Sequence, residues 1–192
     1  GTITENEFRK YANEFIQLSN KINDNWKIVK NVEQNVCYLT KKQKLKVLLN
    51  DDSLPSLETD FEQDSIITED IQTISHHDKD NLLFEYHVCY SISYCVPVLY
   101  FNIFKSDGSL LKLENAWKVF NSVNKESNVA VDMYSILTQM EHPILFKPFF
   151  ALHPCKTAEM LSNVPNSKNK LVTFLSTIGP FVYLKLDLMY GM

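Results

Sequence analysis

An alternation of apolar and polar residues with a period of two, beginning at Phe84, is the strongest structural signal in this chain. Such a period places successive side chains on opposite faces of a strand, so the segment is predicted to be one long, half-buried antiparallel β-strand. Past Pro97 both faces become apolar, which predicts a bend and a more deeply buried continuation, because proline removes a donor from the ladder. The expected inner face carries Phe84, Tyr86, Val88, Tyr90, Ile92, Tyr94, Val96 and Val98, and the opposite face carries Glu85, His87, Cys89, Ser91 and Ser93.

The segment before this strand predicts one helix and two further strands. Thr4 and Glu7 have the spacing of a capping box at the start of an amphipathic helix, which an Asn-Asp-Asn cluster at 23–25 should end. Strands are expected over residues 26–32 and 36–49, the second interrupted by the polar residues 41–44.

The second half of the chain predicts mainly helices. A short helix is expected over 113–120, whereas two prolines inside the apolar run 140–157 indicate a strand plus a loop. Helices are expected just after Cys155 and over 168–178, the latter ending at Gly179. Strands followed by helices predict an α+β fold, and a length of 192 residues predicts a single domain over 1–192.

Residues 51–80 differ from the rest of the chain in charge. They contain ten acidic residues and one basic residue, Lys79, with few apolar side chains. Such a segment cannot bury enough apolar surface to be ordered by itself, so it is predicted to be a long, mobile acidic loop outside the core.

Composition excludes several classes of function. Four glycines, none closely spaced, leave no glycine-rich cradle for a dinucleotide or a nucleoside triphosphate. A net charge of −4 gives no basic face for nucleic acid, so a protein partner is expected. No apolar run is long enough for a membrane span. Four cysteines without a disulfide-scaffold spacing predict a cytosolic protein.

One cysteine differs from the others in its setting. Cys37, Cys89 and Cys95 lie in strand patterns and are interpreted as small buried apolar residues. Cys155 follows His153 and Pro154 at the exit of an apolar strand and precedes a predicted helix, whose first amides would favour a thiolate.

Two other groupings leave alternatives open. Glu85, His87 and Cys89 share a strand face that can be read as metal ligands, although no second pair with ligand spacing accompanies them. A cysteine hydrolase needs a histidine within hydrogen-bond reach of its thiol. His153 is too near in sequence to reach the Cys155 thiol easily, which leaves His87 and His142 as candidates.

Several blocks of this sequence resemble the ubiquitin-like conjugating enzymes of autophagy, specifically the autophagy protein ten family. The blocks together span residues 84 to 180. They are Phe84-Glu85-Tyr86-His87-Val88 through Val96-Pro97-Val98-Leu99-Tyr100-Phe101, Glu141-His142-Pro143-Ile144-Leu145 with Pro148-Phe149-Phe150, His153-Pro154-Cys155-Lys156-Thr157, and Phe174-Leu175-Ser176 with Ile178-Gly179-Pro180.

The resemblance implies a variant ubiquitin-conjugating-enzyme fold with an antiparallel meander and a catalytic cysteine, Cys155, at the sheet edge before a helix. This cysteine would accept the ubiquitin-like autophagy protein twelve as a thioester from the activating enzyme, autophagy protein seven. The modifier would then pass to a lysine of autophagy protein five. The scheme requires no cofactor and no metal, because activation takes place on the upstream enzyme.

One departure from ordinary conjugating enzymes concerns the oxyanion. Those enzymes carry His-Pro-Asn upstream of the cysteine, and the nearest match here is His142-Pro143-Ile144, whose isoleucine side chain cannot donate a hydrogen bond. Two alternatives remain at this stage: a non-catalytic protein-binding module and a cysteine hydrolase. The acceptor is expected to dock on the tyrosine-rich strand 84–101, through the face that carries Glu85, His87 and Ser91.

Overall fold

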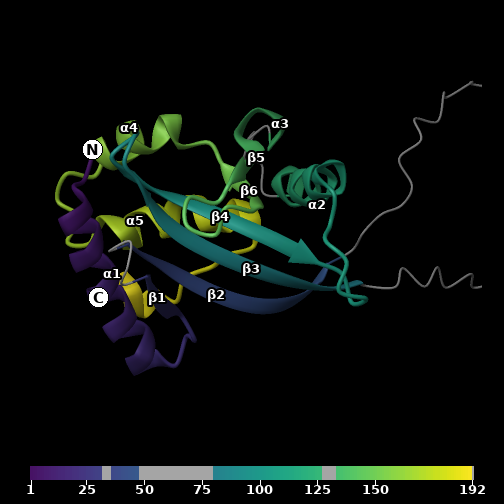
Figure 1. Cartoon of the computed structure of the whole chain (residues 1–192), viewed down its shortest axis with the longest axis horizontal. Helices are drawn as coiled ribbons and strands as arrows, with labels where there is room; N and C mark the ends of the chain where they lie inside the picture. Colours follow the sequence, from purple (N-terminus) through teal and green to yellow (C-terminus); the bar gives the residue numbers. More distant parts are fainter. Residues whose placement is uncertain (32–35, 48–79, 127–132, 192) are drawn as a thin grey trace, which may run out of the picture.

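The computed structural model describes residues 1–31, 36–47, 80–126 and 133–191 (Figure 1). In this part of the chain six strands form one antiparallel sheet in the order β1-β2-β3-β4-β6-β5. The strands are β1 (Lys27–Asn31), β2 (Val36–Val47), β3 (Asp80–Ser91), β4 (Val96–Phe104), β5 (Leu137–Glu141) and β6 (Pro148–Leu152). The helices are α1 (Glu5–Ile22), α2 (Leu113–Glu126), α3 (Met133–Ile136), α4 (Thr157–Ser162) and α5 (Lys170–Ile178), with 3₁₀ turns η1 (Pro154–Lys156), η2 (Gly179–Val182) and η3 (Leu188–Gly191). The predicted α+β class is confirmed.

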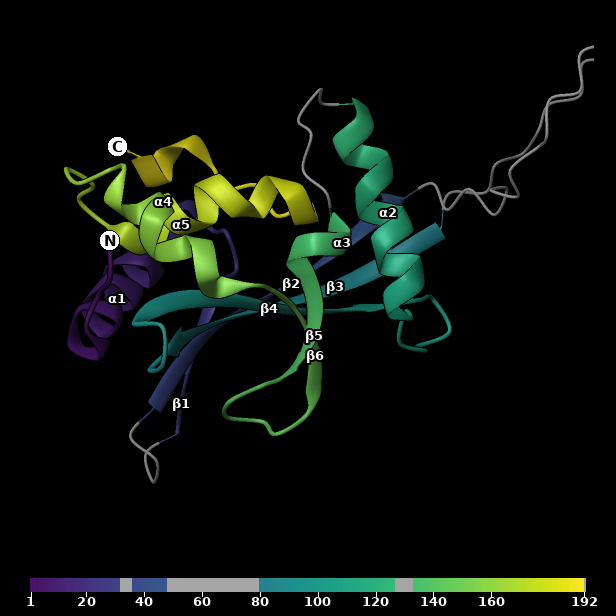
Figure 2. The same ribbon diagram turned by 90° about the horizontal axis from the view of Figure 1, so that it is seen from above.

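The two faces of the sheet have different covers. Figure 2 shows α2, α4 and α5 on one side of the sheet and the loop between β5 and β6 on the other. The larger apolar core lies on the helix side and contains Phe84, Tyr86 and Val88 of β3. The smaller core lies on the loop side and contains Cys89. The predicted alternation along β3 is therefore confirmed from Phe84 to Tyr90.

The predicted long strand is wrong beyond Ser91. The chain turns over residues 92–95, and Ser91 pairs with Val96, so β3 and β4 form a hairpin. Ile92 and Tyr94, expected on the inner face, are 76% and 43% exposed. The turn carries no glycine, asparagine or aspartate; its left-handed position is taken by Cys95, at φ 52°. The alternation of apolar residues continues through the turn, so the sequence pattern does not indicate that a turn is present.

The predicted interruption of the second strand is also wrong, because β2 is continuous through residues 41–44. Its polar side chains have partners elsewhere in the fold. Lys41 forms an ion pair with Asp24. The amide of Gln43 donates to the Tyr86 hydroxyl (3.2 Å) and to the Tyr183 carbonyl oxygen (2.8 Å). These contacts compensate for the polar composition of the strand.

Helix α1 is attached to the end of the chain. The predicted capping box is present: Thr4 Oγ1 accepts from the Glu7 amide (3.2 Å), and Glu7 Oε2 accepts from the Thr4 amide (2.7 Å). Asn23 ends the helix in a left-handed conformation, within the predicted cluster. In η3, Tyr190 stacks on Phe15 with 4.5 Å between ring centroids. The N- and C-terminal elements are thus packed together.

The remaining expectations fall partly outside the described residues. Residues 51–79 of the acidic segment lie outside them, and Asp80 begins β3. The extent of the domain and the mobility of the acidic loop stay predictions. Helix α5 ends before Gly179, as predicted. No helix in the described part of the chain is both long and apolar enough to cross a membrane.

Candidate active site

Cys155 lies on a single 3₁₀ turn between β6 and α4. Strand β6 pairs with β4 at Phe101↔Phe150 on one side and with β5 on the other, so β5 forms the edge of the sheet. The residues of β6 are buried from Phe149 to Leu152, after which the chain leaves the sheet. Pro154 is buried, whereas Cys155 is exposed. The predicted position just before a helix is confirmed, while the strand that precedes Cys155, β6, has a neighbour on each side and is not itself the edge strand.

The side chain of His153 holds this turn. Its Nδ1 accepts a hydrogen bond from the Cys155 amide at 3.2 Å, as an N-cap side chain does. The His153 amide donates to the Ile136 carbonyl oxygen (2.8 Å) and fixes the start of the turn to the end of α3. The ring of Tyr94, from the β3–β4 turn, lies edge-on to the His153 ring with 6.2 Å between centroids. The imidazole therefore binds the backbone of the cysteine.

Exposure separates the four cysteines. Cys89 is buried, and burial raises the pKa of its thiol well above the usual range. Burial also raises the pKa of the half-buried Cys37 thiol, with only partial compensation from Arg9. Cys95 donates from Sγ to the Ile92 carbonyl oxygen (3.4 Å). Cys155 is the exposed thiol among these four, none of which forms a disulfide.

The two candidate base histidines meet each other. His87 Nδ1 and His142 Nε2 are 3.0 Å apart, and Cys89 Sγ lies 3.4 Å from the same nitrogen of His142. His142 Nδ1 accepts from the amides of Ile144 (3.2 Å) and Leu145 (3.1 Å). A neutral His142 therefore carries its proton on Nε2 and donates it to His87. These contacts hold the loop between β5 and β6 against the face of the sheet opposite the helices.

The electrostatics of the cluster favour a neutral His142. Burial, helped by the neighbouring His87, lowers the pKa of His142 to about 4. Glu85 Oε1 lies 3.5 Å from His87 Nε2 and 3.1 Å from Lys42 Nζ. The hydrogen bond from His87, followed by the contact with Lys42, lowers the pKa of Glu85 to about 2. A chain of polar contacts thus runs from the buried loop to the surface at Lys42.

This arrangement does not supply a catalytic base for Cys155. In the described part of the chain, neither His87 nor His142 hydrogen-bonds to the Cys155 thiol, and His153 uses Nδ1 on the backbone. The hydrolase alternative has no support from this geometry. Across residues 1–31, 36–47, 80–126 and 133–191, no group of three or more histidine, cysteine, aspartate or glutamate side chains is arranged to hold a metal ion.

The expected acceptor-docking face is covered at its central residue, His87, whereas Glu85 and Ser91 are partly exposed. His87 is only 3% exposed, because the loop after β5 covers it together with the rings of Tyr38 and Phe149. Tyr86 is buried in the core on the other side. Docking through the His87 side chain is therefore excluded in this conformation. Pattern reasoning missed this cover because the loop is contributed by residues more than 50 positions further along the chain.

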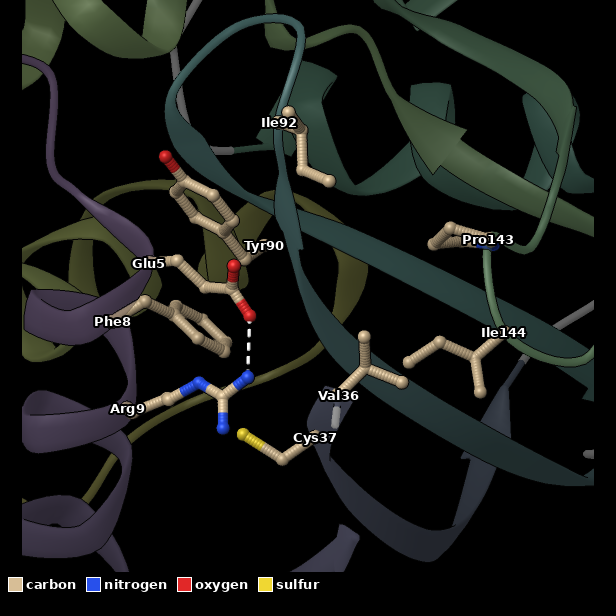
Figure 3. Close-up of a pocket in the computed structure, with 9 residues that line it drawn as sticks. All are labelled: Glu5, Phe8, Arg9, Val36, Cys37, Tyr90, Ile92, Pro143 and Ile144. Carbon is tan, nitrogen blue, oxygen red and sulfur yellow. Dashed lines mark hydrogen bonds and ion pairs between the residues drawn. The ribbon is translucent and has the colours of Figure 1, made fainter. Parts of the chain in front are cut away.

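Sequence reasoning also missed Tyr94. The sequence pattern predicts strand at this position, and nothing in it indicates that the Tyr94 ring lies against His153. The same turn borders a small groove of about 120 Å³, shown in Figure 3. Glu5 and Arg9 of α1 form an ion pair at one side of the groove (2.6 Å). The other residues that line it are Phe8, Val36, Cys37, Tyr90, Ile92, Pro143 and Ile144.

A family model and a human relative match this chain over nearly its whole length. The family described as "Autophagocytosis associated protein, active-site domain" matches residues 7–188. A human protein named "Ubiquitin-like-conjugating enzyme ATG10" is 33% identical over 206 aligned positions, which cover 98% of this chain and 92% of the human protein. A Dictyostelium discoideum protein with the same name is 36% identical over 121 positions, covering 55% of this chain and 52% of that protein.

A solved structure supports the fold independently. The structure titled "Crystal structure of Autophagic E2, Atg10" superposes with a TM-score of 0.52 at 14% identity and covers 96% of this chain and 99% of its own. At that identity the likeness concerns the fold alone. The match of the family over residues 7–188 and the human relative aligned with 98% of the chain show the family itself. The chain belongs to the ATG10 family of ubiquitin-like-conjugating enzymes, the conjugating transferases of autophagy.

Proposed function

We propose that Cys155 carries a ubiquitin-like protein as a thioester and passes it to a lysine of an acceptor protein. By the resemblance of the sequence blocks, the modifier is autophagy protein twelve, the donor is the activating enzyme autophagy protein seven, and the acceptor is autophagy protein five. One observation carries the assignment of the residue. Of the four cysteines in this conjugating enzyme, Cys155 is the exposed one, on a turn at the end of a buried strand.

The reaction consists of two acyl transfers. In the first, the Cys155 thiolate attacks the thioester carbonyl on the activating enzyme; a new C–S bond forms and the donor thiolate leaves. In the second, the unprotonated amine of the acceptor lysine attacks the Cys155 thioester. The C–N bond of the isopeptide forms, the C–S bond breaks, the amine loses a proton and the Cys155 thiol is regenerated.

The loop 142–147 offers little help to the oxyanion in these steps. The Ile144 side chain is apolar, and its amide already donates to His142 Nδ1 at 3.2 Å. The amide of Leu145 donates to the same nitrogen at 3.1 Å. Both donors are thus used inside the protein. Since these donors are occupied, we infer that catalysis relies mainly on positioning the two substrates. The bound acceptor brings its lysine amine close to the thioester.

The test replaces each cysteine and measures charging. The chain is incubated with activating enzyme, modifier and ATP and run on a non-reducing gel. Wild type should form an adduct that reductant removes. Cys155→Ser should form an ester that resists reductant and yields to strong alkali, whereas Cys155→Ala should form no adduct.

Matched controls use the partly buried thiols. Cys37→Ala and Cys95→Ala should charge like wild type. Loss of the adduct in either control, in a variant that still unfolds cooperatively, would transfer the assignment to that residue. A wild-type chain that never forms a thiol-sensitive adduct would support the non-catalytic binding module instead.

A further inference from the structure

The starting observation is that the nucleophile's backbone is held by a titratable side chain. His153 Nδ1 is the acceptor for the Cys155 amide at 3.2 Å. An imidazole nitrogen can accept only when it carries no proton. The bond therefore requires a neutral His153 with its proton on Nε2. In the protonated ring, an N–H at Nδ1 would face the N–H of Cys155, and the hydrogen bond would be lost.

A second contact restrains the ring itself. Tyr94 meets it edge-on, with an angle of 76° between the two planes. The β3–β4 turn, which carries Tyr94, is bonded to the N-terminal segment, because the Ile3 amide donates to the Cys95 carbonyl oxygen (2.8 Å). The Tyr94 amide also donates to Ser91 Oγ (3.4 Å). The rotamer that places Nδ1 on the cysteine backbone is thus supported by a second, fixed element.

We infer that His153 is a positioning residue: its neutral imidazole, supported by Tyr94, holds the turn in the conformation that presents the Cys155 thiol for transfer, and protonation of this imidazole releases the turn. The inference deepens the proposed function and rests on it for its consequence in catalysis. The cap that His153 forms on the Cys155 amide does not depend on which reaction Cys155 performs.

Tyr94 of the β3–β4 turn is a titratable group that packs against the His153 ring, and Cys155 and Lys156 follow His153 in the same turn. Glu159 of α4 pairs with Lys156 at 3.4 Å. This exposed pair is screened by solvent, so it contributes little to the field at the imidazole.

The first experiment examines the cap without any partner protein. Long-range ¹H–¹⁵N NMR at about pH 7.5 reports which ring nitrogen of His153 carries the proton. We expect the proton on Nε2 and an unprotonated Nδ1. A predominant Nδ1–H form would overturn the inference, whatever the outcome of the charging experiments. If wild type failed to charge Cys155, the proposed function would fail while this spectrum would still decide the cap.

The second experiment uses variants that differ in the acceptor. Single-turnover charging is compared for His153→Asn, which keeps a cap acceptor that does not titrate, and His153→Ala, which has none. At pH 8 we expect the asparagine variant to charge about fivefold faster than the alanine variant, the factor typical of one N-cap. Equal rates for the two variants would overturn the inference.

The pH profile separates positioning from a simple charge effect. The rate ratio of His153→Asn to wild type should rise as the pH is lowered from 8, by up to about fivefold, since only the wild-type cap is lost on protonation. Alkylation of Cys155 by iodoacetamide, followed by peptide mass spectrometry, controls for the thiolate fraction at each pH. A charging ratio that stays flat, or one that merely follows the alkylation ratio, would overturn the positioning role.

A matched pair tests the support from Tyr94. Tyr94→Phe keeps the ring against His153 and should charge like wild type to within about twofold. Tyr94→Ala removes the ring and should show a charging defect that His153→Asn does not deepen. Additive defects in the double variant would show that Tyr94 acts separately from His153 and would overturn that part of the inference.

Discussion

Two loops of this molecule begin with the same dipeptide and use it in the same way, yet they differ in burial. His142-Pro143 opens the loop between β5 and β6, and His153-Pro154 opens the turn that carries Cys155. In each, the histidine Nδ1 accepts from the amide two residues further on, Ile144 in one and Cys155 in the other.

The difference lies in what surrounds the imidazole. His142 is fully buried, accepts from a second amide and donates to His87. The imidazole of His153 is exposed, accepts one hydrogen bond from the backbone and makes one ring contact. Burial keeps the first imidazole neutral, whereas the second is exposed to solvent. One local motif thus serves as a buried anchor in the first loop and as an exposed one in the second.

The largest expected effect is the loss of the buried anchor. His142→Ala leaves the amides of Ile144 and Leu145 and one nitrogen of His87 without partners and opens a cavity, so the free energy of unfolding should fall by about 4 kcal/mol. His153→Ala should lower it by only about 1 kcal/mol. Urea unfolding of both variants measures the difference. Similar losses in the two variants would remove the distinction between the loops.

Acid should weaken the buried anchor next. The folded pKa of His142, about 4, lies below its ordinary value of 6.5, so the unfolded chain binds the proton at higher pH. The stabilisation that neutral His142 provides is complete above about pH 6.5. It is lost as the pH falls toward 4, which lowers the free energy of unfolding by about 3 kcal/mol at most. Glu85, with a lowered pKa of about 2, loses its contribution only below its ordinary value of 4.5.

Urea unfolding between pH 7 and pH 4.5 isolates this window. His142→Asn is the control: without the titrating imidazole, its stability should fall less than that of wild type over the same window. A wild-type stability that stays constant over the window would contradict a neutral, buried His142.

Asparagine substitutions sharpen the comparison further. The asparagine side chain can still accept a hydrogen bond from a nearby amide. It is too short to reach, in addition, a partner such as His87 that the far nitrogen of the imidazole contacts. His142→Asn should therefore cost about 2 kcal/mol, since His87 loses its donor, whereas His153→Asn should cost only a few tenths. Thermal or urea unfolding measures both. A larger loss in His153→Asn would mean that the exposed imidazole has partners beyond the Cys155 amide.

The smallest effect is expected at the outer end of the buried chain of contacts. Lys42 is mostly exposed, with its amine 3.1 Å from Glu85. Exposed ion pairs contribute little, so Lys42→Ala should lower the free energy of unfolding by less than about 0.5 kcal/mol. The measurement is again urea unfolding at neutral pH. A loss above 1 kcal/mol would show that the His87–His142 cluster depends on this surface charge.

The parts of the structure that were predictable depend on neighbours in sequence. The capping box of α1 and the placement of His87 and Cys89 on the face opposite Tyr86 follow from periods of 3.6 and 2. The setting of Cys155, after a strand and before a helix, follows from the proline that precedes it. Each of these features is determined within about ten residues.

The features that were missed depend on contacts between distant residues or on turn geometry without the usual residues. His87 and His142 are 55 positions apart, and Gln43 bonds to Tyr183 across 140 positions. No local pattern records such pairs. The β3–β4 turn was missed because Cys95 occupies a conformation usually taken by glycine or asparagine. The contact between Tyr94 and His153 was missed with it.

The packing of the last 3₁₀ turn against the first helix has a consequence for synthesis on the ribosome. Tyr190 stacks on Phe15 and donates to Asp24 across 166 positions. Strand β6 enters the sheet between β4 and β5, so the strand that leads to Cys155 joins β4 only after some fifty intervening residues have been made. A nascent chain therefore cannot complete this fold until η3 has left the exit tunnel, and a product truncated before η3 would expose the apolar face of α1 to chaperones and proteases.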